Sequence, residues 1–138
     1  MSQDRVTITV TEHVADVRLV RTDKRNALDA AMFTGKAEAG ETVKKTPGVR
    51  AVVISGDGQS FCAGLDFEMI AALASGQAAK ETPAAGAIMD TSDRITHLGQ
   101  QVAWVWQEVP VPVIAAVHGH ALGGGIQLAL GADIRFVH

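Results

Sequence analysis

The chain has 138 residues, of which 47% are hydrophobic and 20% are charged, and its formal net charge is −3. This length and composition suffice for one globular domain with a buried core, and they exclude a disordered chain. Lys and Arg form no run longer than two residues, and no apolar run approaches the ~20 residues of a membrane span, which argues against a nucleic-acid surface and a transmembrane helix.

The first part of the chain predicts two strands, a helix and a third strand. Alternating β-branched and polar side chains indicate a half-buried strand, and a second strand directly after it favours an antiparallel pair. Asp29 is the expected N-cap of the helix, and Pro47-Gly48 ends it. The nearly all-apolar run that follows is typical of a strand covered on both faces. These elements cover residues 5–12, 13–20, 22–46 and 49–56, and the inward stripe of the helix is Met32, Phe33, Ala37 and Val43.

The rest of the chain predicts helices and strands in alternation. Asp66 is the candidate N-cap of a short helix, and a segment rich in Gly, Ala and Pro after it is typical of a functional loop. Trp104 and Trp106 cannot both face the core from one helix, so one is expected at an interface or in a substrate pocket. Three glycines, Gly123 to Gly125, open a last helix through Leu130. The expected helices cover 65–74, 93–109 and 123–130, the strands 111–119 and 132–138, and the loop 75–92, and the stripe of the longest helix is Ile95, Leu98, Val102, Val105, Trp106 and Val109.

Strands that alternate with helices predict an α/β fold with right-handed crossovers, in a single domain over residues 1–138. Two loops, "SFCAGLDFE" and "GHALGGGIQ", each follow a covered strand and each open a helix. Ligands of α/β sheets bind beyond the carboxyl ends of the strands, where helix N-termini present unpaired N–H groups. Two such helix ends at one cleft aim two backbone donors at one point, which stabilises a carbonyl oxygen as it gains negative charge.

Three blocks, "RNALD" (25–29), "VRAVVISGDGQSFCAGLDF" (49–67) and "PVIAAVHGHALGGGIQLALGADIR" (112–135), stand out in order along the chain. Together they resemble the enoyl-CoA hydratase/isomerase (crotonase) superfamily, over about residues 5–138. The resemblance implies a spiral of ββα units that binds acyl-CoA thioesters. It implies that the chain is the N-terminal portion of a subunit, with the C-terminal helices absent.

The resemblance also assigns roles to residues of the two loops. It implies that the backbone N–H groups of Leu65 and Gly124 form an oxyanion hole for the thioester. The first loop would lie along the CoA and the thioester. The segment before the first helix would contact the nucleotide end of CoA, where cationic side chains can pair with the phosphates. The binding residues implied are Ala63, Leu65, Asp66, Phe67 and Glu68 in the loop, and Lys24, Arg25, Ala27 and Leu28 before the helix. No metal and no permanently bound cofactor are expected, and the complete subunit would form a homotrimer or hexamer.

One position departs from the family pattern. Hydratases of this family carry a general acid–base glutamate three residues after the oxyanion glycine, and this chain has Gln127 there. An amide can orient water or a carbonyl but cannot exchange a proton, and the family's other acidic position lies beyond residue 138. The sequence therefore favours double-bond isomerisation, or a hydratase-like reaction run by a carboxylate outside this chain. A non-catalytic fragment or pseudoenzyme that binds CoA is the alternative, and an NAD-type oxidoreductase is a third hypothesis.

Several residues have a structural interpretation beside the functional one. The glycine triplet also fits a tight turn, whereas a dinucleotide site calls for G-x-G-x-x-G near the first strand. Cys62 is the only cysteine and is interpreted as a small buried residue, not a nucleophile. His118 and His120 lack a third metal ligand, so packing is favoured. Asp66 is favoured as an N-cap over a catalytic acid, and Glu68 as a partner of the helix dipole over a group in the cleft. The absence of a signal-peptide pattern or a possible disulfide predicts a soluble cytoplasmic protein.

Overall fold

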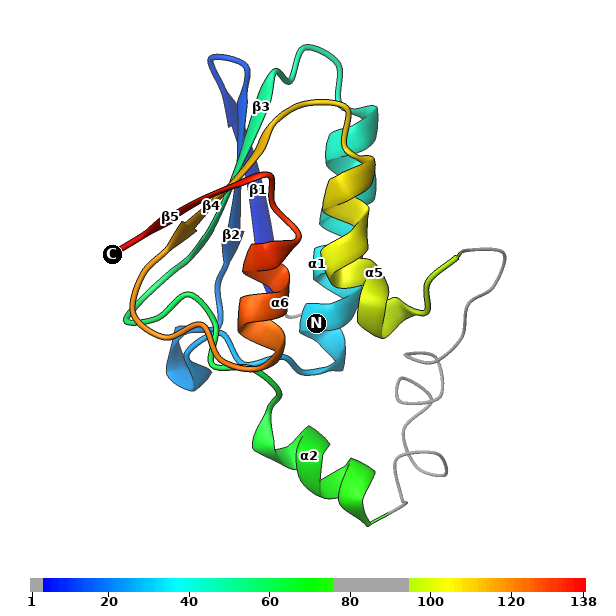
Figure 1. The fold of residues 1–138 in the computed structure, drawn as a ribbon, viewed down its shortest axis with the longest axis vertical. Helices are drawn as coiled ribbons and strands as arrows, with labels where there is room; N and C mark the ends of the chain where they lie inside the picture. The colour runs from blue at the N-terminus through cyan, green and yellow to red at the C-terminus, as the bar shows by residue number, and fades with distance from the viewer. Residues whose placement is uncertain (1–3, 76–94) are drawn as a thin grey trace.

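The computed structural model describes residues 4–75 and 95–138, which form one sheet with helices along one side (Figure 1). The loop predicted over 75–92 lies, beyond Ser75, outside the described residues, as do positions 93 and 94 of the predicted long helix. No helix within the two described ranges is long and apolar enough to cross a membrane.

The sheet has five strands in the order β1-β2-β3-β4-β5. The first two strands are antiparallel, as predicted, and every later neighbour is parallel. Each parallel pair is joined by a crossover that contains a helix, as parallel pairing requires. The strands are β1 (Val6–Thr11), β2 (Val14–Leu19), β3 (Ala51–Gly56), β4 (Val113–Val117) and β5 (Ile134–Val137), each within two residues of its predicted bounds.

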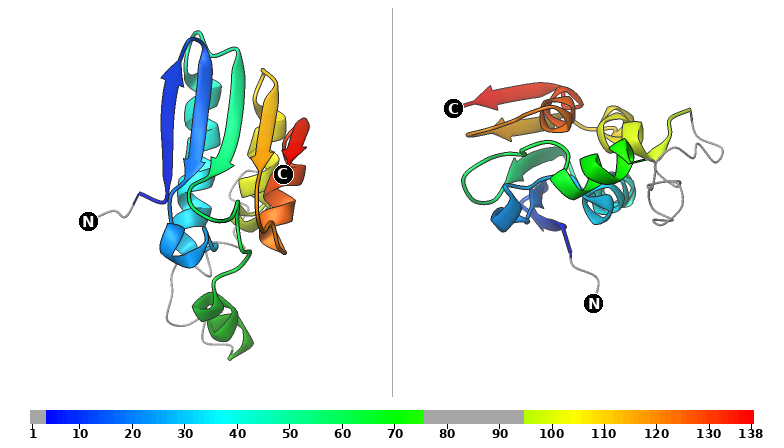
Figure 2. Two further views of the ribbon diagram at one scale, coloured as in Figure 1. Left: turned by 90° about the vertical axis from the view of Figure 1, so that its left-hand side faces the viewer. Right: turned by 90° about the horizontal axis from the view of Figure 1, so that it is seen from below.

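Three helices, α1, α5 and α6, cover one face of the sheet, and α2 lies apart from it beyond the strand ends (Figures 1 and 2). The predicted cover on both faces of β3 and β4 is therefore wrong within the described residues. Residues such as Val53 and Ile114 alternate with fully buried ones and are only half-buried. The helical elements are η1 (Thr22–Lys24), α1 (Ala30–Lys45), α2 (Phe67–Ala74), α5 (Leu98–Trp104), η2 (Val105–Glu108) and α6 (Gly124–Leu130).

Helix α1 begins where the sequence predicts. The Asp29 carboxylate accepts the backbone N–H of Met32 at 2.8 Å, which satisfies one of the unpaired donors of the first turn. Thr46 follows the helix in an extended conformation, ahead of the proline. The four predicted inward residues, Met32, Phe33, Ala37 and Val43, are all buried in the core, so this stripe is confirmed.

A lysine lies on the same buried face of α1, which sequence reasoning did not single out. Lys36 has no solvent exposure, and its Nζ makes no hydrogen bond with the described part of the chain. The Nζ lies 4.2 Å from the centroid of the Trp106 ring, a cation–π distance. Burial lowers the pKa of this amine from 10.5 to about 7, against a smaller opposing effect of Cys62. The helical spacing of its apolar neighbours predicts that Lys36 points toward the core, but a lysine side chain is usually found at the surface.

The long helix predicted over 93–109 is shorter and changes type. His97 is extended (φ −76, ψ 165) and is the N-cap, so the prediction is wrong for residues 95–97. Ile95 precedes the helix and is 79% exposed, so it is not part of the stripe. Trp106 is buried and donates its indole N–H to the Val102 carbonyl, whereas Trp104 stays 41% exposed. Side chains two positions apart on a helix point in different directions, as predicted for this pair.

Candidate active site

Three loop segments run beside one another where β2, β3 and β4 end. Leu28 forms an isolated parallel bridge with Leu65, and Cys62 forms another with Ala121. The N–H of Leu28 bonds to the Gly64 carbonyl at 2.7 Å, which holds the first of these bridges. The loop that carries "CAGLD" is thus held between "RNALD" on one side and the glycine-rich loop on the other.

The backbone N–H groups of Leu65 and Gly124 have no acceptor within the described residues. In a parallel bridge, the residue opposite Leu28 directs its own N–H to the other side. Gly124 is the first residue of α6, so its N–H has no partner inside the helix. The Gly124 nitrogen is 3.8 Å from the point that a Cβ on Gly64 would occupy, so the two loops are in contact here. The fold therefore brings these two unpaired donors to neighbouring loops.

The three glycines of the triplet differ in the atoms that surround them. A Cβ on Gly125 would collide with the Cys62 carbonyl, which is backbone and cannot move aside. A Cβ on Gly124 would lie 2.6 Å from the Leu28 Cδ1, the end of a flexible side chain. Gly123 has open space around it but a φ of +48, a conformation that favours glycine. Close packing of α6 on the first loop therefore explains Gly125, and the turn explains Gly123.

Two cavities meet at these donors. The larger, of about 900 Å³, extends toward α5 and η2, and the smaller, of about 710 Å³, extends toward η1 and α2. Leu65, Gly123 and Gly124 line both cavities, so the two unpaired N–H groups belong to the wall that the cavities share. An elongated ligand can therefore occupy both cavities and present its middle to both donors.

The structure gathers the sequence-predicted binding residues around the smaller cavity, with one exception. Leu28 lines the larger cavity, as does Gln127. Phe67 is 87% exposed, and Glu68 lies beside it in the first turn of α2. The predicted binding residues that line the smaller cavity are Lys24, Arg25, Ala27, Ala63, Leu65, Asp66, Phe67 and Glu68.

Asp66 is an N-cap and also part of a buried ion pair. Its Oδ1 accepts the N–H of Glu68 at 2.9 Å, so α2 begins at Phe67 and not at the predicted residue 65. Its Oδ2 lies 2.7 Å from the Arg21 Nη1, and both side chains are buried. Burial raises the pKa of Asp66, but the Glu68 N–H and the hydrogen bond and charge of Arg21 outweigh it, so the pKa lies below its ordinary value. Sequence reasoning missed Arg21, because nothing along the chain marks its contact with Asp66.

We expect Asp66→Asn to lower the free energy of unfolding by about 2 kcal/mol at pH 7, measured by denaturant titration. This is less than the ~3–5 kcal/mol of a fully unpaired buried charge, because Asn still caps α2 and the Asp29 carboxylate remains 3.5 Å from Arg21. The folded-state pKa of Asp66 is depressed, so its stabilisation is present above the unfolded value near 4 and disappears as the pH falls through the folded value. The difference between wild type and variant should therefore shrink below about pH 4.

The matched control is Asp16→Asn, which removes an exposed partner of Arg18. Exposed pairs contribute little, so this change should stay within about 0.5 kcal/mol. Equal effects of the two substitutions would contradict a stabilising role for the buried pair.

A buried asparagine ties the segment before α1 to the loop after β3. Asn26 has a φ of +56 and no solvent exposure. Its Oδ1 accepts the Arg21 N–H at 2.8 Å, and its Nδ2 donates to the carbonyls of Asp57 and Ser60, both at 2.9 Å. These bonds satisfy backbone groups that no sheet partner reaches. The sequence contains the signal, an Asn inside "RNALD", but the role depends on loops distant along the chain.

The cysteine and the histidine pair have structural partners. Cys62 is fully buried, its Sγ donates to the Asn26 carbonyl at 3.1 Å, and burial raises the pKa of its thiol. His118 Nε2 lies 2.9 Å from the Gly58 carbonyl, and His120 Nδ1 lies 3.1 Å from the Ser60 Oγ. The described ranges hold no group of three side chains that could bind a metal.

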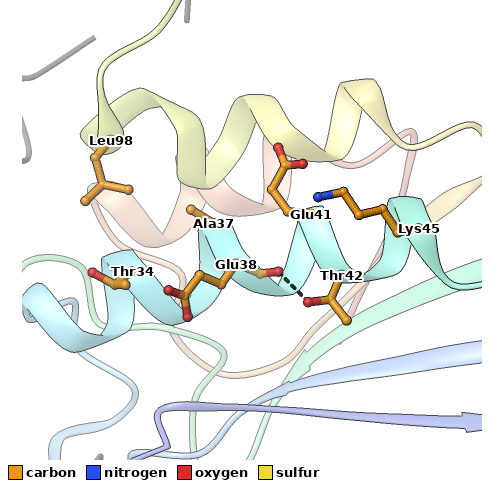
Figure 3. Close-up of a pocket in the computed structure, with 7 residues that line it drawn as sticks. All are labelled: Thr34, Ala37, Glu38, Glu41, Thr42, Lys45 and Leu98. Carbon is orange, nitrogen blue, oxygen red and sulfur yellow. Dashed lines mark hydrogen bonds between the residues drawn. The ribbon is translucent and has the colours of Figure 1, made fainter. Parts of the chain in front are cut away.

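A third cavity, of about 490 Å³, lies between α1 and α5 and is shown in Figure 3. Its lining residues are Thr34, Ala37, Glu38, Glu41, Thr42, Lys45 and Leu98. None of them lines the two cavities that meet at Gly124. This groove is therefore separate from the candidate site.

The sequence model of the enoyl-CoA hydratase/isomerase family matches residues 9–138 of this chain. The chain belongs to this family. Curated relatives include the mitochondrial Delta(3,5)-Delta(2,4)-dienoyl-CoA isomerase of Mus musculus, 34% identical over 126 residues, which cover 91% of this chain and 37% of the relative. Another is the (E)-benzylidenesuccinyl-CoA hydratase of Thauera aromatica, 33% identical over 131 residues, which cover 94% of this chain and 45% of the relative.

Solved structures of the enoyl-CoA hydratase/isomerase family have the same fold. The enoyl-CoA hydratase of Bacillus anthracis superposes with a TM-score of 0.77 at 27% identity, over 96% of this chain and 47% of that one. The enoyl-CoA hydratase of Mycobacterium avium subsp. paratuberculosis superposes with a TM-score of 0.74 at 25% identity, over 96% and 46%. The predicted fold class, the N-terminal portion of a crotonase-like α/β fold, is confirmed. The chain spans less than half the length of these relatives.

Proposed function

We propose that this enoyl-CoA hydratase/isomerase family member binds an acyl-CoA thioester with its carbonyl oxygen between the N–H groups of Leu65 and Gly124. The CoA portion would follow the smaller cavity, and the acyl group would enter the larger one. One observation carries this proposal: two backbone donors that find no acceptor in the described part of the chain lie in the wall that both cavities share. The relatives whose names include acyl-CoA substrates support the same substrate class.

Polarisation of the thioester carbonyl is the chemical contribution of this pair of donors. As the carbon next to the carbonyl loses a proton, negative charge moves onto the thioester oxygen. Donors that are already oriented toward this oxygen stabilise the charge without reorganisation, and the loss of one donor of this kind costs about 2.7–4 kcal/mol in the barrier. Gly124 is the first residue of α6, a helix of one to two turns. In so short a helix, the hydrogen bond from the Gly124 N–H stabilises the thioester oxygen more than the helix dipole does.

The amide of Gln127 bears on which reaction of the acyl-CoA fits this site best. Its side chain lines the larger cavity and makes no hydrogen bond within the described residues. Its amide can hold a water molecule or a polar group of the substrate, but it cannot supply the proton exchange that two-acid hydration requires. A double-bond isomerisation needs one proton-transferring group, because the proton that leaves one carbon returns to another. We therefore favour isomerisation over hydration.

We expect a thioether analogue of an acyl-CoA to bind this chain with saturation in a calorimetric titration. Neutralising the cations of the smaller cavity with Lys24→Gln and Arg25→Gln should weaken binding by up to about fivefold per residue, because exposed charges interact weakly with phosphates in water. The same substitutions should leave binding of the matching acyl-pantetheine thioether, which lacks the nucleotide, unchanged.

The control is Lys45→Gln, an exposed lysine of the separate groove, which should alter neither titration. Absence of saturable binding would overturn the proposal. Binding together with no turnover of any enoyl-CoA would favour the alternative, a CoA-binding protein without catalysis, which the amide at Gln127 supports. Stabilisation of the fold by NAD instead would support the oxidoreductase hypothesis. The homotrimer or hexamer and the cytoplasmic location stay predictions.

A further inference from the structure

A histidine that sequence reasoning did not single out lines the larger cavity. His97 is the residue before α5, and it shares this cavity with Leu65, Gly124 and Gln127. It comes from the crossover between β3 and β4, on the side of the cavity formed by α5, whereas Gln127 comes from α6.

The imidazole of His97 makes no hydrogen bond with the described part of the chain. Its Nδ1 is buried with no hydrogen-bond partner among residues 4–75 and 95–138, and its side chain does not cap the helix that it precedes. His13, His118 and His120 differ, because each has a ring nitrogen within hydrogen-bond distance of a backbone carbonyl or a hydroxyl. A buried polar atom without a partner costs stability, so the ring is not held in place by hydrogen bonds of its own. Because Nδ1 is closed to solvent, the Nε2 edge of the ring is the one that a ligand in the cavity can reach.

We propose that His97 is the catalytic residue that moves the proton in this site, in place of the acid that is absent at Gln127. The inference rests on the proposed function, since it needs an acyl-CoA thioester between the two backbone donors. Imidazole is the side chain that gains and loses a proton most readily near neutral pH. The cavity otherwise offers proton-inert amides and hydroxyls among its described polar residues, Thr96, Gln100, Gln107 and Gln127.

His97 alone can carry out the proton transfer of a double-bond isomerisation. Neutral imidazole takes a proton from the carbon next to the thioester carbonyl of a 3-enoyl-CoA. The electron pair of that C–H bond enters the carbonyl system as a dienolate, whose oxygen the N–H groups of Leu65 and Gly124 stabilise. Imidazolium then returns the same proton to the fourth carbon. The double bond between the third and fourth carbons is lost, one between the second and third carbons forms, and no other reactant is consumed.

The test is exchange of the α-proton of a saturated acyl-CoA such as butyryl-CoA for deuterium in D₂O, followed by mass spectrometry beside a binding titration. In His97→Asn we expect exchange to fall by about 100-fold while the affinity for butyryl-CoA changes less than twofold. Asn is a favoured N-cap residue, so α5 is expected to keep its start.

The matched control is His13→Asn, the same substitution at an exposed histidine on the β1–β2 turn, which should leave exchange and binding unchanged. In His97→Ala, added imidazole should restore part of the exchange, which a merely structural role would not allow. Binding with equal exchange in His97→Asn, or binding without exchange in the wild type, would overturn the role of His97 and leave the proposed binding mode intact. Absence of binding in the wild type would overturn both.

Discussion

Replacement of Lys36 by methionine is expected to raise the free energy of unfolding by about 4 kcal/mol at pH 7. The Lys36 amine is fully buried and has no hydrogen-bond partner within the described ranges, so folding either removes its proton or buries its charge. A fall of its pKa from 10.5 to about 7 costs about 5 kcal/mol in full, at about 1.4 kcal/mol for each pKa unit, and slightly less at pH 7, where the folded amine is half protonated. Methionine has a similar length and contacts aromatic rings favourably, so it can occupy the space against Trp106.

The pH dependence gives an independent check. Between pH 7 and 10.5 the unfolded chain binds a proton at Lys36 that the folded chain has lost, so the stability of the wild type rises with pH in this window. Lys36→Met lacks this rise, and the gap between the two proteins should close toward pH 10.5. Cys62, whose pKa burial raises, acts in the opposite direction above its unfolded value, but it is present in both proteins, so only its smaller coupling to Lys36 differs between them.

The control for this prediction is Lys45→Met, an exposed lysine at the end of the same helix, which should change stability by less than about 0.5 kcal/mol. A loss of stability in Lys36→Met, or a constant gap across this pH range, would show that the buried amine has a partner or an accessible position in solution.

Removal of the Leu65 N–H by Leu65→Pro is expected to slow α-proton exchange of a bound acyl-CoA by about 100- to 1,000-fold. This is the usual effect of losing one donor to a developing oxyanion. The N–H of Leu65 has no acceptor within the described residues, so proline breaks no internal hydrogen bond. Affinity for the ground-state thioester should change far less than the rate, because the donor acts mainly on the charge that develops during reaction.

Two comparisons separate the donor from the side chain. Leu65→Val keeps the N–H and should retain exchange within a few-fold of the wild type. Gly124→Ala and Gly124→Pro both place a Cβ against Leu28, but only proline removes the N–H, and proline suits the first position of a helix. Equal rates in the alanine and proline variants at position 124, with folding retained, would contradict a role for this donor.

Local patterns were sufficient where structure depends on neighbours along the chain. The carboxylates of Asp29 and Asp66 cap helices as predicted, because N-caps need only a short polar side chain and the next N–H groups. The start of α5 was predicted too early, since the spacing of Ile95 fits a helix although the chain there is not helical. The prediction that β3 and β4 are covered on both faces was also wrong within the described residues. An apolar strand sequence does not determine whether one or two layers pack against the sheet.

The sequence by itself determined the family, the order of strands and helices along the chain and the loops that carry the candidate site, since these follow from periodicity, turn residues and three blocks of motif. Only the tertiary structure decided which groups meet. A bridge between distant loops directs the Leu65 N–H away from its neighbour, and Gly124 starts α6, so both N–H groups lie in one wall without an acceptor among the described residues. Burial left Lys36 Nζ and His97 Nδ1 without hydrogen-bond partners among the described residues. Such outcomes depend on desolvation and on contacts between residues far apart in the chain, and neither quantity is carried by the identity or the spacing of neighbouring residues.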